Sequence, residues 1–151
     1  MKFLTKPVPE NFTVIVFDLD GTLTKSKLPI DREMKTLLLR LMKNYRVVVV
    51  GGGKFNLFEE QLLQKLPRHS NELGSLFLFP TNGTAMYRYQ NTWKNVYKHE
   101  ILLSARKKIK GAIQEALRRV QYAAPKRIYG SVIEDRGTQI TFSAIGQQAP
   151  L

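Results

Sequence analysis

One short stretch limits the possible folds more than any other, because an apolar run there ends in two carboxylates, a glycine and a hydroxyl. It is residues 14–24, VIVFDLDGTLT. Four consecutive apolar residues, three of them β-branched, predict a strand that is covered on both faces. Gly21 allows a sharp turn after this strand. Ligands of open α/β sheets bind beyond the carboxyl ends of the strands, so Asp18 and Asp20 are expected at a site of chemistry.

Helices and strands alternate through the first half of the chain. Apolar residues at helical spacing follow Asp31, a typical N-cap residue, and predict a helix over about 32–43. A valine run predicts a strand over 47–50, a helix should begin near Phe55 and stop at Pro67, and a third strand is expected over 76–79. This alternation predicts a parallel sheet with right-handed crossovers.

A hairpin and a second, smaller unit are predicted for the rest of the chain. The hairpin strands are expected over 84–89 and 92–97, and a helix is expected from Ser104 to about Val120. Two final strands are predicted over 128–134 and 138–144. The domain boundary is expected near residues 99–103, and residues 1–12 are expected to be a short, loosely ordered lead-in.

Composition excludes several classes of protein. The chain has no cysteine, which fits a reducing cytosol and excludes disulfides, thiolate metal sites and a cysteine nucleophile. No apolar run approaches the ~18 residues of a membrane span, and the first seven residues lack the apolar core of a secretory signal. We therefore expect a cytoplasmic protein with no membrane partner.

The formal net charge of +12 suits nucleic acid, anionic membrane or phosphorylated substrates. The densest basic cluster lies on the helix predicted after Ser104, where no aromatic residue interleaves to stack on bases. A solvated helix face is the favoured interpretation, so nucleic acid is not the expected partner. A non-catalytic basic binding protein and an inactive truncated fragment remain as alternatives from a different class.

Two acids separated by one residue can hold a hard cation through oxygen, and one can attack phosphorus while the other moves a proton. Aspartates beside glycine are also common turn formers, which explains most Asp-x-Asp-Gly strings without any chemistry. The complete pattern, a hydrophobic strand followed by DxDGTLT, is more specific. It resembles the first motif of the haloacid dehalogenase superfamily.

Further stretches resemble the sugar-phosphate branch of that superfamily, its subclass II, which contains the eukaryotic phosphomannomutases and related bacterial phosphatases. They follow in the family's order: residues 17–24, 49–52, 79–83, 133–136 and 143–146. The resemblance implies an α/β fold, a partial doubly wound, Rossmann-like parallel sheet with part of an α+β cap. Residues 1–100 would form a partial catalytic core with the hairpin, and residues 101–151 a partial cap domain.

The resemblance also implies chemical roles. Asp18 would be the nucleophile that forms an aspartyl phosphate, Asp20 would be the general acid and then the base, and Mg²⁺ would be held by the Asp18 carboxylate and the Asp20 backbone carbonyl. The expected activity is that of a Mg²⁺-dependent phosphatase for a phosphorylated sugar. A phosphomannomutase-like mutase is the alternative, and a homodimer through the cap is possible.

Substrate contacts are implied at several positions. Thr22 would offer its hydroxyl and amide to a phosphate oxygen, or would merely cap the turn. Gly52 and Gly53 would present backbone N–H groups to phosphate with Lys54 nearby, or would form a flexible turn. Arg136 matches a phosphate-binding arginine of the family's cap, although a surface hairpin residue would look the same.

The chain departs from the family pattern at three positions that bear on substrate binding. Lys27 replaces an arginine and loses its bidentate fork, Gly53 replaces a serine, and Gln147 replaces a second cap arginine. These losses argue against a mutase, which must grip a bisphosphorylated sugar at both ends. The superfamily's catalytic lysine and its Gly-Asp-rich metal loop have no counterpart, so we expect the amino-terminal part of a longer enzyme or a natural truncation, inactive alone.

Overall fold

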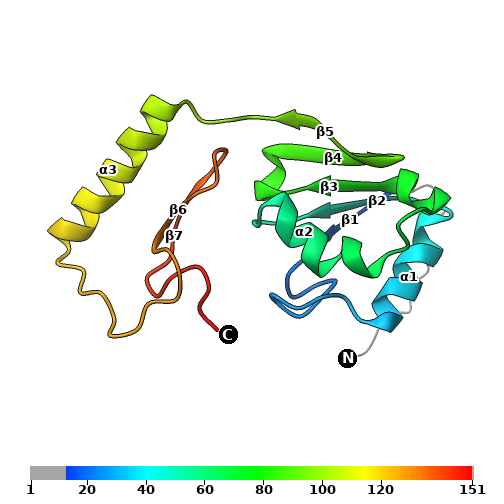
Figure 1. The fold of residues 1–151 in the computed structure, drawn as a ribbon, viewed down its shortest axis with the longest axis horizontal. Coiled ribbons are helices and arrows are strands. Elements are labelled where there is room, and N and C mark those ends of the chain that lie inside the picture. Colours follow the sequence, from blue (N-terminus) through cyan, green and yellow to red (C-terminus); the bar gives the residue numbers. More distant parts are fainter. Residues whose placement is uncertain (1–12, 151) are drawn as a thin grey trace.

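A computed structural model describes residues 13–150, and the predicted lead-in over residues 1–12 lies outside this range. The elements follow in the order β1 (Val14–Asp18), α1 (Arg32–Met42), β2 (Arg46–Val50), α2 (Phe55–Gln61), β3 (Leu76–Phe79), β4 (Ala85–Gln90), β5 (Thr92–Lys98), α3 (Leu103–Arg119), β6 (Ile133–Asp135) and β7 (Ile140–Phe142) (Figure 1). Helix α1 begins as predicted, because the Asp31 side chain accepts a hydrogen bond from the Met34 N–H at 2.8 Å.

Within residues 13–150, the main sheet contains five strands in the order β1-β2-β3-β4-β5. Strands β1, β2 and β3 are parallel, and the hairpin β4–β5 extends the sheet in antiparallel pairing. The predicted α/β fold and its parallel sheet are therefore confirmed. Asn91, at the hairpin turn, has a φ of 61°, a left-handed conformation that asparagine tolerates.

The core lies between one face of this sheet and two helices. Parallel pairing aligns Ile15 with Val47 and Leu76, and one layer further on it aligns Phe17 with Val49 and Leu78. The middle and third members of each row are fully buried. Helices α1 and α2 cover this face with Leu38, Met42 and Phe58, together with Leu62 directly after α2. The carboxyl ends of β1 and β2 are thereby fixed against a rigid layer.

The prediction that the strand before Asp18 is covered on both faces is wrong. Val14 is 41% exposed and Val16 is 61% exposed, and the alternate residues of β1 are only partly buried. Within residues 13–150, β1 forms the edge of the sheet, and the core helices pack on the face opposite Val14 and Val16. An apolar run cannot reveal how many of its faces find a partner.

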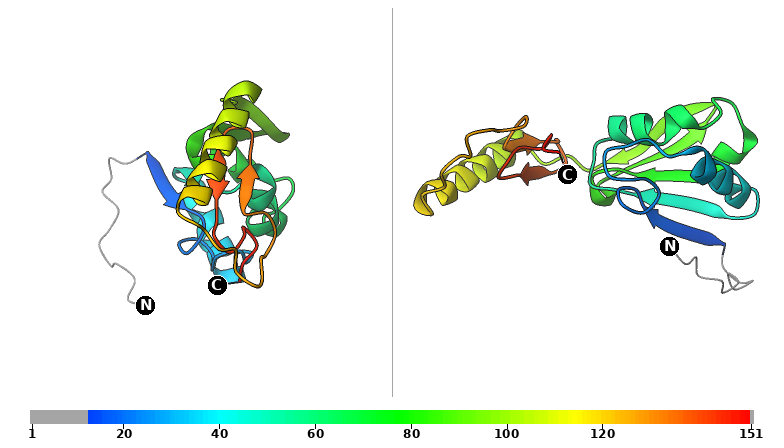
Figure 2. Two further views of the ribbon diagram at one scale, coloured as in Figure 1. Left: turned by 90° about the vertical axis from the view of Figure 1, so that its left-hand side faces the viewer. Right: turned by 90° about the horizontal axis from the view of Figure 1, so that it is seen from below.

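The second unit consists of α3 beside the two-stranded antiparallel sheet β6–β7, joined to β5 by one extended segment (Figures 1 and 2). Its strands are shorter than predicted, and residues 128–132 form no strand. Gly130 and Gly146 have φ values of 74° and 91°, which interrupt the extended backbone. Within residues 13–150, no helix combines the length and apolar composition that crossing a bilayer requires.

Candidate active site

The loop after β1 presents its two acids by burying the leucines between and after them. Leu19 and Leu23 are 1% and 4% exposed and anchor the loop in the core. Gly21, with a φ of 79°, donates its N–H to the Thr24 carbonyl at 2.7 Å and closes the turn. Asp18 therefore faces solvent, and Asp20 is half-buried just beyond the carboxyl end of β1.

Two hydrogen bonds hold the Asp20 carboxylate. Its Oδ1 accepts the Lys27 backbone N–H at 3.0 Å and the Gln61 Nε2 at 3.2 Å. Lys27 has a φ of 62°, so a left-handed turn aims its N–H at Asp20. Gln61 is buried, and its Oε1 has no hydrogen-bond partner within the described residues. The sequence analysis did not identify Gln61, although a polar residue inside the apolar stripe of α2 could have signalled it.

A cavity of about 780 Å³ lies between the core and the second unit. Most predicted site residues line it, namely Asp20, Lys27, Gly52, Gly53, Lys54 and Arg136. Asp18 and Thr22 do not belong to its lining and are exposed beside it. The structure also adds residues that the sequence analysis gave no binding role, namely Ser26, Asn56, Leu57, Glu60, Ser131, Glu134, Gln147 and Gln148.

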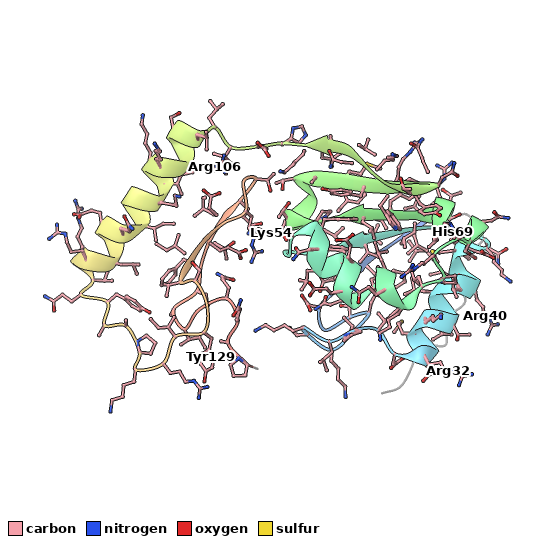
Figure 3. All side chains as sticks on the ribbon, viewed as in Figure 1. Arg32, Arg40, Lys54, His69, Arg106 and Tyr129 are labelled. Atoms are coloured by element: carbon pink, nitrogen blue, oxygen red, sulfur yellow. The ribbon has the colours of Figure 1, made fainter. Side chains whose placement is uncertain are left out.

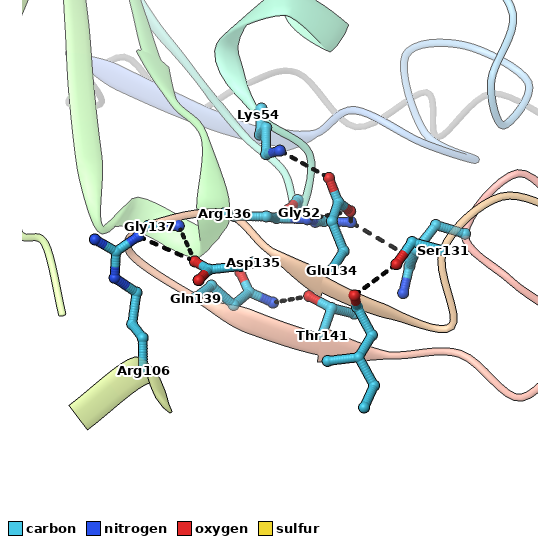
Figure 4. A network of polar contacts seen from close by, with 12 residues as sticks. Gly52, Lys54, Arg106, Ser131, Glu134, Asp135, Arg136, Gly137, Gln139 and Thr141 are labelled. Carbon is cyan, nitrogen blue, oxygen red and sulfur yellow. Dashed lines mark hydrogen bonds and ion pairs between the residues drawn. The ribbon is translucent and has the colours of Figure 1, made fainter. Parts of the chain in front are cut away.

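An ion-pair network faces this cavity from both units (Figure 4), and Figure 3 shows Lys54 on the side of the core that faces the second unit. Lys54 Nζ lies 2.9 Å from Glu134 Oε1, and Arg136 Nη2 lies 2.8 Å from Glu134 Oε2. Arg136 also donates through Nη1 to the Gly52 carbonyl oxygen. The arginine side chain is only 13% exposed, so it is a largely covered contact between the two units rather than a surface hairpin residue.

The electrostatics of the two neighbouring acids follow from these contacts. Burial would raise the pKa of Glu134, but the hydrogen bonds from Lys54 and Arg136 outweigh burial and lower that pKa overall. The pKa of Asp135 is lowered first by the Gly137 backbone N–H and then by Arg106. Both acids therefore remain ionised near neutral pH.

A second polar contact joins the units behind the cavity. Thr138 Oγ1 donates to Thr81 Oγ1 at 3.0 Å, and both residues are buried. Asn82 Nδ2 lies 3.4 Å from Gln139 Oε1. Thr81 and Asn82 have φ values of 49° and 56°, so the turn after β3 is strained. This turn meets the segment that connects β6 to β7, and it lies beside the glycine loop that follows β2.

Asp18 and Asp20 can supply some of the oxygen ligands of a hard cation at the carboxyl end of β1. Within the described part of the chain, no three His, Asp or Glu side chains gather as a metal site. Asp18 and Asp20 offer oxygen donors only, which suit Mg²⁺ rather than a softer metal. Mg²⁺ is commonly held by one or two carboxylates and completed by water and substrate phosphate, so two acids can suffice for binding.

The chain belongs to the haloacid dehalogenase-like hydrolase family, whose sequence profile matches residues 15–145. Among characterised proteins it is similar to phosphomannomutases. It is 29% identical over 145 residues to a probable phosphomannomutase of Caenorhabditis elegans. The aligned region covers 95% of this chain and 55% of the relative. It is 31% identical over 147 residues to mouse phosphomannomutase 1, with 90% and 50% covered. The chain thus spans about half the length of these relatives.

Solved structures support the fold. An IMP-bound, N-terminally truncated IMP-nucleotidase of Plasmodium falciparum superposes with a TM-score of 0.61 at 12% identity, over 87% of this chain and 40% of that protein. A haloacid dehalogenase-like hydrolase of B. subtilis gives a TM-score of 0.50 at 23% identity, over 74% of this chain and 35% of that one. The predicted resemblance and fold class are therefore confirmed.

Proposed function

We propose that the chain carries the phosphoryl-transfer site of a phosphosugar enzyme, in the first place a mutase of the phosphomannomutase type. The observation that carries the proposal is the position of Asp20. It is fixed at the carboxyl end of β1 and faces a cavity whose other walls hold the cations Lys27, Lys54 and Arg136. An acid opposite several cations suits a phosphate ester, and the similarity to phosphomannomutases favours a sugar phosphate.

In the proposed reaction, an Asp18 carboxylate oxygen attacks phosphorus and the bond from phosphorus to the leaving oxygen breaks. Asp20 gives its proton to that oxygen, and the product is an aspartyl phosphate on Asp18. Lys54 and Arg136 neutralise the phosphate charge from the far side of the cavity. Mg²⁺ held by the Asp18 carboxylate and the Asp20 backbone carbonyl would supply further neutralisation.

A sugar phosphatase is the second candidate, and two residues favour it. Gln147 replaces a second cap arginine, and Gly53 offers no hydroxyl. A mutase would pass the phosphoryl group from Asp18 to a sugar, whereas a phosphatase would pass it to water. A cytoplasmic location, a division into core and cap near residue 100 and a homodimer through the cap stay predictions.

The test is Asp18→Asn in the full-length protein. The amide is nearly isosteric but is neither a competent nucleophile nor a good ligand for Mg²⁺. We expect turnover of an aryl phosphate and of a hexose phosphate to fall at least about a thousandfold, with the circular dichroism spectrum unchanged. Activity within tenfold of wild type would refute the role of Asp18. A requirement for a hexose bisphosphate in the wild type would distinguish the mutase from the phosphatase.

A further inference from the structure

Glu134 bridges two cations that come from opposite sides of the cavity. Lys54 follows β2 of the core, whereas Arg136 belongs to the β6–β7 turn of the second unit (Figure 4). Each carboxylate oxygen of Glu134 takes one cation, at 2.9 Å for Lys54 and 2.8 Å for Arg136. The Arg136 Nε also donates to Glu134 Oε2 at 2.9 Å, so the guanidinium holds this oxygen with two N–H groups.

This arrangement has the donors that a phosphate group requires. An arginine fork and an ammonium bind carboxylate and phosphate oxygens by the same charge-assisted hydrogen bonds. Gln147 Oε1 accepts a hydrogen bond from Arg136 Nη2 at 3.4 Å and helps to place the guanidinium, while its Nε2 is buried without a partner among residues 13–150. The adjoining cavity of about 780 Å³ has room for a phosphorylated sugar.

We propose that the Glu134 carboxylate occupies the phosphate position between Lys54 and Arg136 while no ligand is bound, and that the phosphate group of a substrate displaces it. The inference rests on the proposed function only for the substrate class, a phosphate ester. Glu134 is thus a positioning residue that holds both cations while the site awaits its ligand.

The exchange is favoured by charge and by the way Arg136 is anchored. A phosphate monoester carries about −1.5 to −2 charges near pH 7, against one on the carboxylate. Lys54 is 44% exposed, so its ion pair with Glu134 is weak, and a phosphate group can accept from Arg136 the same pair of hydrogen bonds that Glu134 Oε2 accepts now. Arg136 keeps its hydrogen bond to the Gly52 carbonyl and stays in place. A bound phosphate would then connect the core to the second unit as Glu134 does now.

The experiment is isothermal titration calorimetry, in which inorganic phosphate is added to the full chain in the absence of Mg²⁺. Glu134→Gln removes the competing charge and should tighten phosphate binding about three- to tenfold. Glu115→Gln is the matched control, because Glu115 pairs with Arg118 and Arg119 on the exposed face of α3, far along the chain from Lys54 and Arg136. Its affinity should stay within twofold of wild type. Lys54→Met combined with Glu134→Gln should abolish the gain.

Several outcomes would overturn the proposal. These are unchanged or weaker binding in Glu134→Gln, an equal gain in Glu115→Gln, and no detectable phosphate binding by either protein. If Glu134→Gln does not fold, the carboxyl carbon signal of Glu134 in the wild type decides, because saturating phosphate should shift it and an unmoved signal would refute displacement. Repeating the titration with a hexose phosphate separates binding of free phosphate from binding of a substrate. Turnover is not measured, so a failed Asp18 assignment would leave these results intact.

Discussion

Gly53 lies in the loop after β2, where the backbone is held in place and a side chain would collide with Leu57. A Cβ at this position would lie 2.2 Å from Leu57 Cδ2, which is the far end of a flexible side chain. The Gly53 carbonyl accepts the Thr81 N–H at 2.9 Å, so the backbone itself is held. A larger residue therefore requires Leu57 to turn away while the loop stays where it is.

We predict that Gly53→Ser strengthens inhibition by orthovanadate, because it adds a hydroxyl beside the cavity. A neutral hydrogen bond contributes on the order of 1 kcal/mol, so the gain over Gly53→Ala should be several-fold. Gly53→Ala is the control, since it displaces Leu57 without adding a hydroxyl. Equal inhibition of the two variants would contradict the alignment of this glycine with the serine of phosphomannomutases.

Local sequence motifs predict several of the residues that line the cavity, but they do not predict the contacts between those residues and the rest of the molecule. Asp20, Lys54 and Arg136 are predictable from local motifs and do line one cavity. The sequence analysis gave no binding role to Gln61 or Glu134, whose contacts with Asp20 and Lys54 join residues that are distant in sequence. Gln61 lies 41 positions from the aspartate that it contacts, and no local pattern encodes such a pair.

Within the second unit, replacing either of two glycines by alanine is expected to change the stability of the protein, but in opposite directions. Gly146 has a φ of 91°, and a Cβ there would lie 2.1 Å from the Tyr129 carbonyl oxygen. Gly111 lies within α3, and a Cβ there would meet nothing within 4 Å. Gly146 is thus required by the backbone, whereas Gly111 only weakens its helix.

Gly146→Ala should destabilise the protein by at least about 2 kcal/mol, since the left-handed backbone and the backbone clash add together. Gly111→Ala should stabilise it by roughly 0.5–1 kcal/mol. Thermal unfolding followed by circular dichroism would measure both. A melting temperature that is unchanged in Gly146→Ala would contradict the left-handed conformation of the backbone after β7.

The bounds of helices and strands are predictable where apolar residues recur regularly over a long stretch. They are less predictable where contacts with other elements determine the local backbone. Helix α1 and strands β2 and β3 lie within a residue or so of their predicted bounds. The strand predicted over 128–134 retains only β6, because Gly130 bends the chain before it. The environment of β1 differs from the prediction for a related reason, since burial depends on neighbours that a strand's own sequence does not contain.

Across the molecule, the two units differ in what stabilises them. The core contains a sheet with fully buried valines and leucines, whereas α3 has no buried residue among those described. Contacts of the second unit with the core and within itself depend heavily on charge, through Glu134 and Asp135. The second unit should therefore respond more strongly to pH.

We predict that acid loosens the second unit before the core. Because the pKa values of Glu134 and Asp135 are lowered on folding, the stabilisation they provide is fully present above the usual carboxyl pKa of about 4 and is lost as pH falls from there through the lowered pKa values. Between pH 7 and about 3, amide protection factors in α3 and β6 should fall at least about tenfold relative to those in β2 and β3. A uniform fall in both units would contradict this.

The strand order of the sheet has a consequence for how the chain folds. Every strand of the sheet pairs with a strand next to it in the sequence, so β1 to β5 can assemble in the order in which they leave the ribosome. No strand of this sheet has to wait, exposed, for a distant partner to be synthesised. Within residues 13–150 the outer edge of β1 stays unpaired, so a strand that joined it would dock onto a preformed template.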